Sequence, residues 1–403
     1  MDHIAEDVLL LLFAELSGGE VLEWPDAIYE HEKAKAPFLI SSVCRRWRNI
    51  ACNVPTLWTY FGFPDNPSQY PQHATRLQVL LEASGSAPVD VIVVIGTASD
   101  YHRDSIALHS ILCEGSLAAI GGIGARWRNV RFRLPERAAI HLQPALQGNL
   151  PQLVSLSAVT DAEWYSLPSA PRLTRLYQEC LGAAEPGVVS LEGDTFPSLS
   201  NLAILSANPY SNITYALCEQ NATRLQHLCI MDSCFKTFDP IHLLRLLSLE
   251  VDDQRWLAYL RAPNLRSLAI NGSTRIASSD VLAAFAGIVE LTLHSNIDPG
   301  LVAHLTCLTA IRVLSFCQTA ATRTCYPRYF AYRIPRGFFA SLNVTGEGPP
   351  VWPSLERVYF EQSGREHLNF DVGDLRTFVG ARNKAYDAGS RATCRVIVEG
   401  LNL

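Results

Sequence analysis

The sequence predicts an α+β chain, with a small N-terminal helical module followed by a curved, irregular α/β solenoid that contains a parallel sheet. Three observations predict this. The chain has 403 residues, more than one ordinary domain of roughly 100–200 residues holds. Leucine supplies 53 of these residues, a surplus typical of helical bundles and repeat arrays. Finally, apolar residues crowd the first predicted helix, and a leucine pattern recurs through the rest of the chain.

The first sixty residues contain more apolar surface than two short helices bury against each other. Residues 6–16 place large apolar side chains on nearly every face of a predicted helix, where a surface helix has one stripe. A second helix is predicted over Phe38–Cys52, before Pro55, and residues 17–37 are predicted as a loop with room for one short helix. Either the rest of the chain covers the surplus or another protein does.

The charge and the cysteine content indicate which type of partner and which cellular compartment to expect. The net charge is −6, and residues 1–62 carry 9 acids against 5 bases, so nucleic acid is not an expected partner. The 11 cysteines include no Cys-x-x-Cys pair, which is typical of free thiols in a reducing compartment. No apolar run approaches the length of a membrane span. We therefore expect the protein in the cytoplasm, the nucleus or both, away from membranes.

Three segments of the module carry a family resemblance. Ile4–Phe13, Leu39–Ala51 with its Val-Cys-Arg-x-Trp core, and Pro55–Trp58 together resemble an F-box. The preceding Ala36-Pro37 is similar to the loop end in basidiomycete members. In that family the helices dock on a Skp-type adaptor, which links them to a cullin–RING (SCF-type) ubiquitin ligase. The resemblance implies an adaptor contact in or beside Ile4, Val8, Leu9, Leu12, Val43, Cys44 and Trp47.

The rest of the chain repeats a Leu-x-x-Leu-x-Leu frame at intervals of 19–26 residues, with a last interval of 44. This spacing is typical of leucine-rich repeats, whose unit is one strand and a helical or irregular return. Proline stands two residues before the frame in five cases, where it suits the entry to a strand. The frames begin at Trp127, Leu153, Leu173, Leu199, Leu225, Leu246, Leu265, Ile288, Ile311 and Leu355. We expect one parallel strand in each.

These patterns divide the chain into three segments. Residues 1–62 form the helical module. Residues 63–126 form a linker and an N-terminal cap, with a predicted helix over 74–84 and a predicted strand over 88–95. Residues 127–403 form the repeat array, which an aromatic-rich insertion interrupts at 323–350.

Strand residues that alternate with the leucines are predicted to face the concave side of the array, where repeat proteins bind their partners. Their charges have both signs, so they indicate a protein target without naming its class. The candidate target-binding residues are Arg131, Arg133, Arg175, Tyr177, His227, Glu250, Asp252, Glu290, His294, Arg357 and Tyr359. The same face includes Asn129, Glu179, Met231, Asn271 and Glu361.

Sequence motifs of catalysis and metal binding are missing. The chain has no phosphate-binding glycine loop, no Gly-x-Ser-x-Gly elbow and no His-Glu-x-x-His pair. His227, Cys229 and Cys234 come nearest to a metal cluster, but no fourth ligand accompanies them. We therefore expect no cofactor, no metal and no enzymatic activity. A secreted β-helix enzyme that cuts carbohydrates is the enzyme-class alternative, and it requires several short strands per repeat.

The predicted function is that of a substrate receptor in an SCF-type ligase, in which the module holds the adaptor and the array holds an unknown protein target. The alternative is a protein-interaction scaffold whose degenerate F-box serves only packing. The two differ in one observable feature. Val8, Leu12 and Trp47 form an exposed patch in a receptor, whereas residues 63–126 cover them in a scaffold.

Overall fold

We describe the protein from a computed structural model. The described residues are 4–17, 31–63, 70–95, 114–160, 168–180, 195–206, 213–232, 239–253, 255–270, 279–294, 297, 304–317, 334, 337–342, 351–360, 372–387 and 395–399. The chain divides into two compact units, which we treat separately. The first contains residues 1–199 and 206–212, and the second contains residues 200–205 and 213–403. The predicted segment limits at 62 and 126 both lie inside the first unit.

The helical module consists of α1 (Glu6–Ser17), α2 (His31–Val43), α3 (Arg45–Cys52) and the 3₁₀ helix η1 (Pro55–Trp58). The prediction of one helix over Phe38–Cys52 is wrong, because this segment contains two helices, α2 and α3. Helix α2 begins earlier, at His31, and includes Pro37. It then ends before Cys44, which adopts extended backbone angles and caps α3 by accepting a 3.5 Å hydrogen bond from Trp47 N at its Sγ.

Aromatic contacts hold the module together. The Phe13 ring of α1 packs edge-on against Trp47 of α3, with a centroid distance of 5.1 Å. Phe38 of α2 packs in the same way against Trp58, at 5.4 Å. Trp58 is buried, and its indole Nε1 donates a 2.8 Å hydrogen bond to the carbonyl oxygen of Ala51. All four helical pieces therefore share one core.

The first unit continues from the module into a parallel sheet with strands in chain order. Its strands are β1 (Tyr60–Phe63), β2 (Val89–Val94), β3 (Trp127–Leu134), β4 (Ser155–Thr160) and β5 (Arg175–Cys180). Its remaining helices are α4 (Tyr70–Ala83), η3 (Gly124–Arg126), α6 (Glu136–Ala139) and α7 (Gln143–Leu146), and residues 114–122 are also helical. One buried apolar row crosses the strands at matching register: Phe61, Val91, Val130, Leu156 and Leu176.

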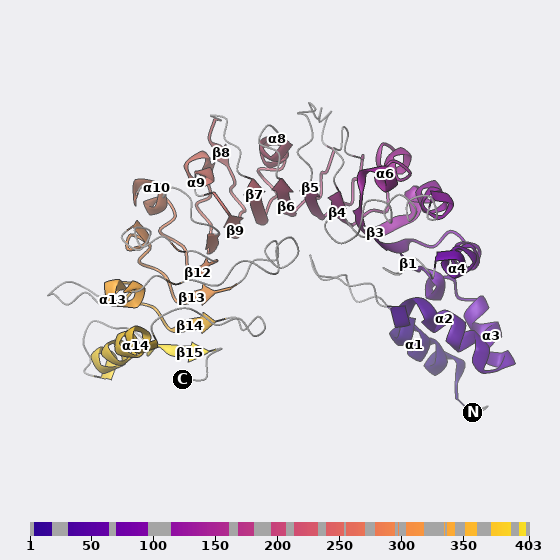
Figure 1. Cartoon of the computed structure of the whole chain (residues 1–403), viewed down its shortest axis with the longest axis horizontal. Helices are drawn as coiled ribbons and strands as arrows, with labels where there is room; N and C mark the ends of the chain where they lie inside the picture. Colours follow the sequence, from indigo (N-terminus) through magenta and orange to yellow (C-terminus); the bar gives the residue numbers. More distant parts are fainter. Residues whose placement is uncertain are drawn as a thin grey trace. The chain divides into compact units, whose positions relative to one another are not determined.

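The second unit repeats this arrangement (Figure 1). Its sheet contains β6 (Asn201–Ser206), β7 (His227–Asp232), β9 (Ser248–Val251), β11 (Ser267–Ile270), β12 (Glu290–Leu293), β13 (Val313–Phe316), β14 (Arg357–Phe360) and β15 (Ile397–Glu399). A separate parallel pair is formed by β8 (Ile241–His242) and β10 (Leu260–Arg261). The helices are α8 (Ile213–Gln220), α9 (Trp256–Tyr259), α10 (Ser279–Ala283), α13 (Phe338–Leu342) and α14 (Val372–Asp387). The buried row here is Leu228, Leu249, Leu268, Leu291, Leu314 and Val358.

The predicted strands are confirmed. Every leucine frame coincides with a strand, and from Leu153 onward each strand begins two residues after the start of its frame. Among the described residues the sheet strands number thirteen, five in the first unit and eight in the second, and all pairs given above are parallel. The predicted cap helix and strand are also present, as α4 and β2. The α/β class with a large parallel sheet therefore holds.

The two units differ in the second face of their strands. In the second unit β9, β11 and β13 alternate between buried and half-buried residues, so one face is at least partly open to solvent. In the first unit β3 also alternates, with exposed or half-buried residues on its second face, whereas β4 is buried at all six positions. The open face that repeat proteins use for binding is therefore best developed in the second unit.

A buried arginine stabilises a strained loop in the second unit. Trp352 is fully buried although its φ is +53°, a left-handed value that residues other than glycine rarely adopt. Its indole Nε1 donates a 3.1 Å hydrogen bond to the carbonyl oxygen of Leu305. Arg382 of α14, itself buried, donates to the carbonyl oxygens of Val351 and Trp352. The guanidinium thus satisfies two carbonyl groups of the loop that holds Trp352.

We predict that Arg382→Met lowers the free energy of unfolding of the second unit by about 2–3 kcal/mol, because it leaves those carbonyl groups without their charged donor. Urea denaturation followed by circular dichroism measures the change. The control is Arg376→Met, an exposed position on the same helix. Equal urea midpoints for the two variants would show that the loop does not need the guanidinium.

Candidate protein-interaction surfaces

The helical module carries an exposed apolar patch on α1 and α2. We define the apolar patch as Val8, Leu11, Leu12, Leu16, Leu39 and Val43. The exposed fractions of these side chains range from 47% for Val8 to 72% for Leu11. Large apolar side chains left exposed together on neighbouring helices often belong to interaction sites.

The patch follows from the residue spacing on α1. Leu9 and Phe13 are four residues apart, so they share one helix face, and both are fully buried in the module. Val8, Leu12 and Leu16 are spaced in the same way and share a second face, which is exposed. One apolar face of α1 therefore packs in the core of the module, and the other remains available for contact with another protein.

The structure separates the residues that the resemblance assigned to the adaptor contact. Val8, Leu12 and Val43 lie in the apolar patch. Leu9, in contrast, is fully buried, so its side chain supports the fold and is not available at the surface. Trp47 is half-buried against Phe13.

The two remaining assigned residues, Ile4 and Cys44, make hydrogen bonds that stabilise the module itself. Ile4 is half-buried, and its carbonyl oxygen accepts a 2.7 Å hydrogen bond from Arg46 Nη2. Cys44 is exposed and caps α3. Three patch residues, Leu11, Leu16 and Leu39, were not assigned from the sequence, although Leu11 and Leu16 lie three and eight residues after Val8 and this helical spacing could have identified them.

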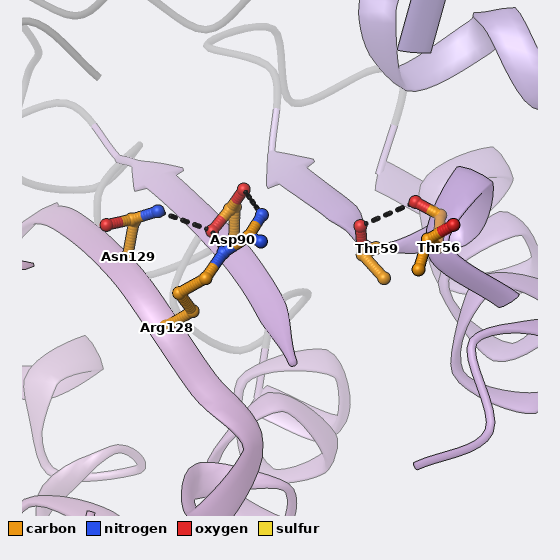
Figure 2. A network of polar contacts seen from close by, with 5 residues as sticks. All are labelled: Thr56, Thr59, Asp90, Arg128 and Asn129. Carbon is orange, nitrogen blue, oxygen red and sulfur yellow. Dashed lines mark hydrogen bonds and ion pairs between the residues drawn. The ribbon is translucent and has the colours of Figure 1, made fainter. Parts of the chain in front are cut away.

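A network of polar contacts joins the module to the sheet (Figure 2). Thr59 Oγ1 donates to the carbonyl oxygen of Thr56 at 2.9 Å, and the carbonyl oxygen of Thr59 accepts from Asp90 N at 2.8 Å. The Asp90 carboxylate accepts from Arg128 Nε and Nη2 at 3.0 and 2.5 Å, and from Asn129 Nδ2 at 2.8 Å. These bonds connect η1, β1, β2 and β3 in sequence.

An irregularity in β3 makes this network possible. Consecutive residues of a regular strand point to opposite faces, so Arg128 and Asn129 would not both reach Asp90. The register between β2 and β3 shifts at this point, because Val89 pairs with Trp127 and Asp90 pairs with Asn129. The extra residue, Arg128, bends toward the carboxylate, as in a β-bulge. The hydrogen bonds to Asp90 raise the pKa of the Arg128 guanidinium.

The polar face of the first unit is less open than predicted. Tyr177 is 3% exposed, and its hydroxyl donates a 2.8 Å hydrogen bond to Glu179 Oε2, which is equally buried. Tyr177 is therefore a buried residue and not a surface contact for a target. Arg131, Arg133 and Arg175 are half-buried on the same face.

The polar face of the second unit presents the larger share of the predicted target-binding residues. His227, Glu290, Arg357 and Tyr359 are exposed, and Arg357 Nε lies 3.4 Å from Glu399 Oε1. Glu250 and Asp252 are half-buried. His294 was predicted to face a target but is 6% exposed, because it lies against Glu250 and the carbonyl oxygen of Cys317. The further positions Asn271 and Glu361 lie outside the described residues.

The described part of the chain contains no group of three His, Cys, Asp or Glu residues placed to hold a metal ion. Cys234 of the predicted near-cluster lies outside it. Burial raises the pKa of the Cys218 thiol to about 12, and the pKa of Cys229 is also raised, chiefly by burial. Both thiols stay protonated at neutral pH, which makes them poor nucleophiles. None of the described helices has the length and apolar character that a membrane span requires.

We predict that Asp90→Ala lowers the free energy of unfolding of the first unit by about 2 kcal/mol, because it removes the partner of a half-exposed arginine and of Asn129. Hydrogen exchange should also become faster in η1 and β1, because Asp90 N donates to the carbonyl oxygen of Thr59, between these two elements, and loss of the carboxylate loosens this end of β2. Asp280→Ala on α10 is the exposed control. Unchanged exchange in η1 and β1 would contradict the coupling between module and sheet.

Comparison with known proteins adds no family to this description. No protein-family model matches the chain, and no curated protein matches it. The function proposed next therefore rests on the residues and their geometry.

Proposed function

We propose that the protein is a substrate-receptor subunit of an SCF-type cullin–RING ubiquitin ligase. The observation that carries the proposal is the apolar patch, six exposed side chains on a module whose core is already complete. Five of its six residues lie within the segments that resemble an F-box, and Leu16 lies three residues beyond the first of these segments. The proposed partner is a Skp-type adaptor, and through it a cullin.

The energetics of the patch support a protein partner. Fully burying a leucine or valine contributes about 1.5–3 kcal/mol, so each roughly half-exposed patch residue can add about 1 kcal/mol when a partner covers it. Helices that present apolar side chains at intervals of three and four residues commonly bind in the groove of a second protein. On α1, Val8, Leu11 and Leu12 have this spacing.

Exposed charges of both signs lie next to the patch: Glu6, Asp7 and Glu15 on α1, and two arginines on α3. Arg45 and Arg48 are exposed at the start of α3, directly after Val43. Arg48 Nε donates a 2.9 Å hydrogen bond to the carbonyl oxygen of Ser41, which fixes the corner between α2 and α3. Charges at the rim of an apolar contact mainly raise the association rate and the specificity.

The proposed mechanism involves no bond-making by this chain. The module holds the adaptor, and the partly open sheet face of the second unit holds a protein target. Exposed His227, Glu290, Arg357 and Tyr359 are the residues best placed for that contact. Holding both partners raises the effective concentration of target lysines at the ligase.

One observation favours the alternative of a scaffold that never meets a ligase. The Asp90 network ties the module to the sheet, so the helices also have a structural role. A scaffold of this kind keeps the module folded but does not bind the adaptor. Adaptor binding therefore distinguishes the two functions.

We predict that a purified Skp-type adaptor captures the full-length wild-type chain, and that Leu12→Asp together with Val43→Asp weakens capture by at least about tenfold, because each change places a charge in an apolar contact. Val79→Asp is the matched control, since Val79 is 41% exposed on α4, outside the patch. Circular dichroism establishes that all variants are folded.

Two outcomes would overturn the receptor function in favour of the scaffold. One is the failure of the wild-type chain to bind the adaptor. The other is equal binding by the double variant and the Val79→Asp control.

A further inference from the structure

The second unit places a half-buried carboxylate against a buried imidazole on the polar face of its sheet. Glu250 lies in β9, and His294 directly follows β12. Glu250 Oε1 and His294 Nε2 are 3.4 Å apart. The side chain of His294 is 7% exposed and that of Glu250 is 30% exposed, so water screens the pair only in part.

A small residue between the two strands allows this contact. Strand β11 lies between β9 and β12, and its residue beside Glu250 is Ala269, which pairs onward with Thr292. The alanine methyl leaves room above the sheet for the Glu250 side chain to cross β11 diagonally. A longer side chain at Ala269 would occupy that path.

The other ring nitrogen of His294 fixes the tautomer. Nδ1 lies 2.8 Å from the backbone carbonyl oxygen of Cys317, after β13. A carbonyl oxygen only accepts hydrogen bonds, so Nδ1 carries a hydrogen. The state of Nε2, which faces Glu250, therefore depends on whether a further proton is present.

The titratable groups on the same face affect that proton in opposite directions. From β7, the Cys229 thiol donates a hydrogen bond to Glu250, which lowers the pKa of the Glu250 carboxyl group against the larger, opposite effect of burial. His227 lies on the same face of β7, Asp252 directly follows β9, and Glu290 begins β12. Within the described part of β11 the same face has only Ser267 and Ala269, and from β13 the nearest titratable group is Cys317.

We propose that Glu250 and His294 form a shared-proton site, a latch that connects β9 to β12 across β11 while one proton lies between them. With that proton present, the contact is a hydrogen bond between neutral groups or an ion pair, and both are attractive. Without it, the lone pair of Nε2 faces an ionised carboxylate, and the contact becomes repulsive. This inference does not depend on the proposed ligase function.

The direction of the pH effect follows from the position of Glu250. Burial raises the pKa of its carboxyl group, so the folded chain holds a proton that the unfolded chain has already released. The stabilisation is therefore complete below the unfolded pKa of Glu250. It is lost as the pH rises through the higher folded pKa.

Hydrogen exchange at a series of pH values tests the latch. In the full-length wild-type chain, protection factors of amides in β9, β11 and β12, corrected for intrinsic exchange, should fall with rising pH by about tenfold for each unit by which folding raises the pKa of the pair. In Glu250→Gln this loss of protection with rising pH should disappear, because the amide does not titrate: its NH2 donates to a neutral Nε2, and its oxygen accepts from a protonated one. The control Asp280→Asn changes an exposed carboxylate on α10, outside the sheet, and should retain the wild-type pH profile.

Two results would overturn the latch: a wild-type profile that does not vary with pH, or a Glu250→Gln profile that keeps the wild-type slope. If Glu250→Gln does not fold, ¹⁵N shifts of His294 in the wild-type chain replace it, with His294→Gln used for assignment. Nδ1 should remain protonated throughout while Nε2 titrates at the pH where protection falls. A titration at any other pH would also overturn the proposal.

Discussion

Both units depend on one physical constraint: parallel strands must bury one apolar face continuously, so the apolar residues of successive strands must occupy the same register position. The leucine row from Leu228 to Leu314 satisfies this constraint in the second unit, and the row from Phe61 to Leu176 satisfies it in the first. A slip of one residue would turn such a row toward solvent, which explains why the repeat spacing varies while the frame does not.

This constraint also explains which parts of the fold the sequence predicts. Each strand with a leucine frame can be predicted from the sequence, because the residues that face the core must be large and apolar and therefore repeat at a fixed spacing. Strands β1 and β15 were not predicted. At β1, Trp58, Phe61 and Phe63 have the spacing of the frame but include no leucine, and Ile397–Glu399 has no frame. The break at Cys44 was also missed, because helix-compatible residues surround it and only its extended backbone reveals it.

The candidate surfaces are only partly predictable, for a related reason. The spacing on α1 predicts two apolar faces but not which of them is buried, so Leu9 and Leu12 look equivalent until Phe13 is seen against Trp47. Alternation along a strand predicts which residues share the polar face. It does not predict whether that face is covered, and for this reason Tyr177 and His294 are buried while Tyr359 is exposed. Burial of a face depends on contacts between elements, which no local pattern contains.

The proposed receptor function joins these features. A module completed by aromatic packing leaves the apolar patch uncovered, and the Asp90 network ties that module to the sheet. Hydrogen exchange of the full-length chain with and without a Skp-type adaptor–cullin complex tests this account most directly. Protection on binding should concentrate in residues 6–16 and 39–48, on the apolar patch and the adjoining start of α3. Binding without protection there, or protection confined to the second unit, would contradict the account.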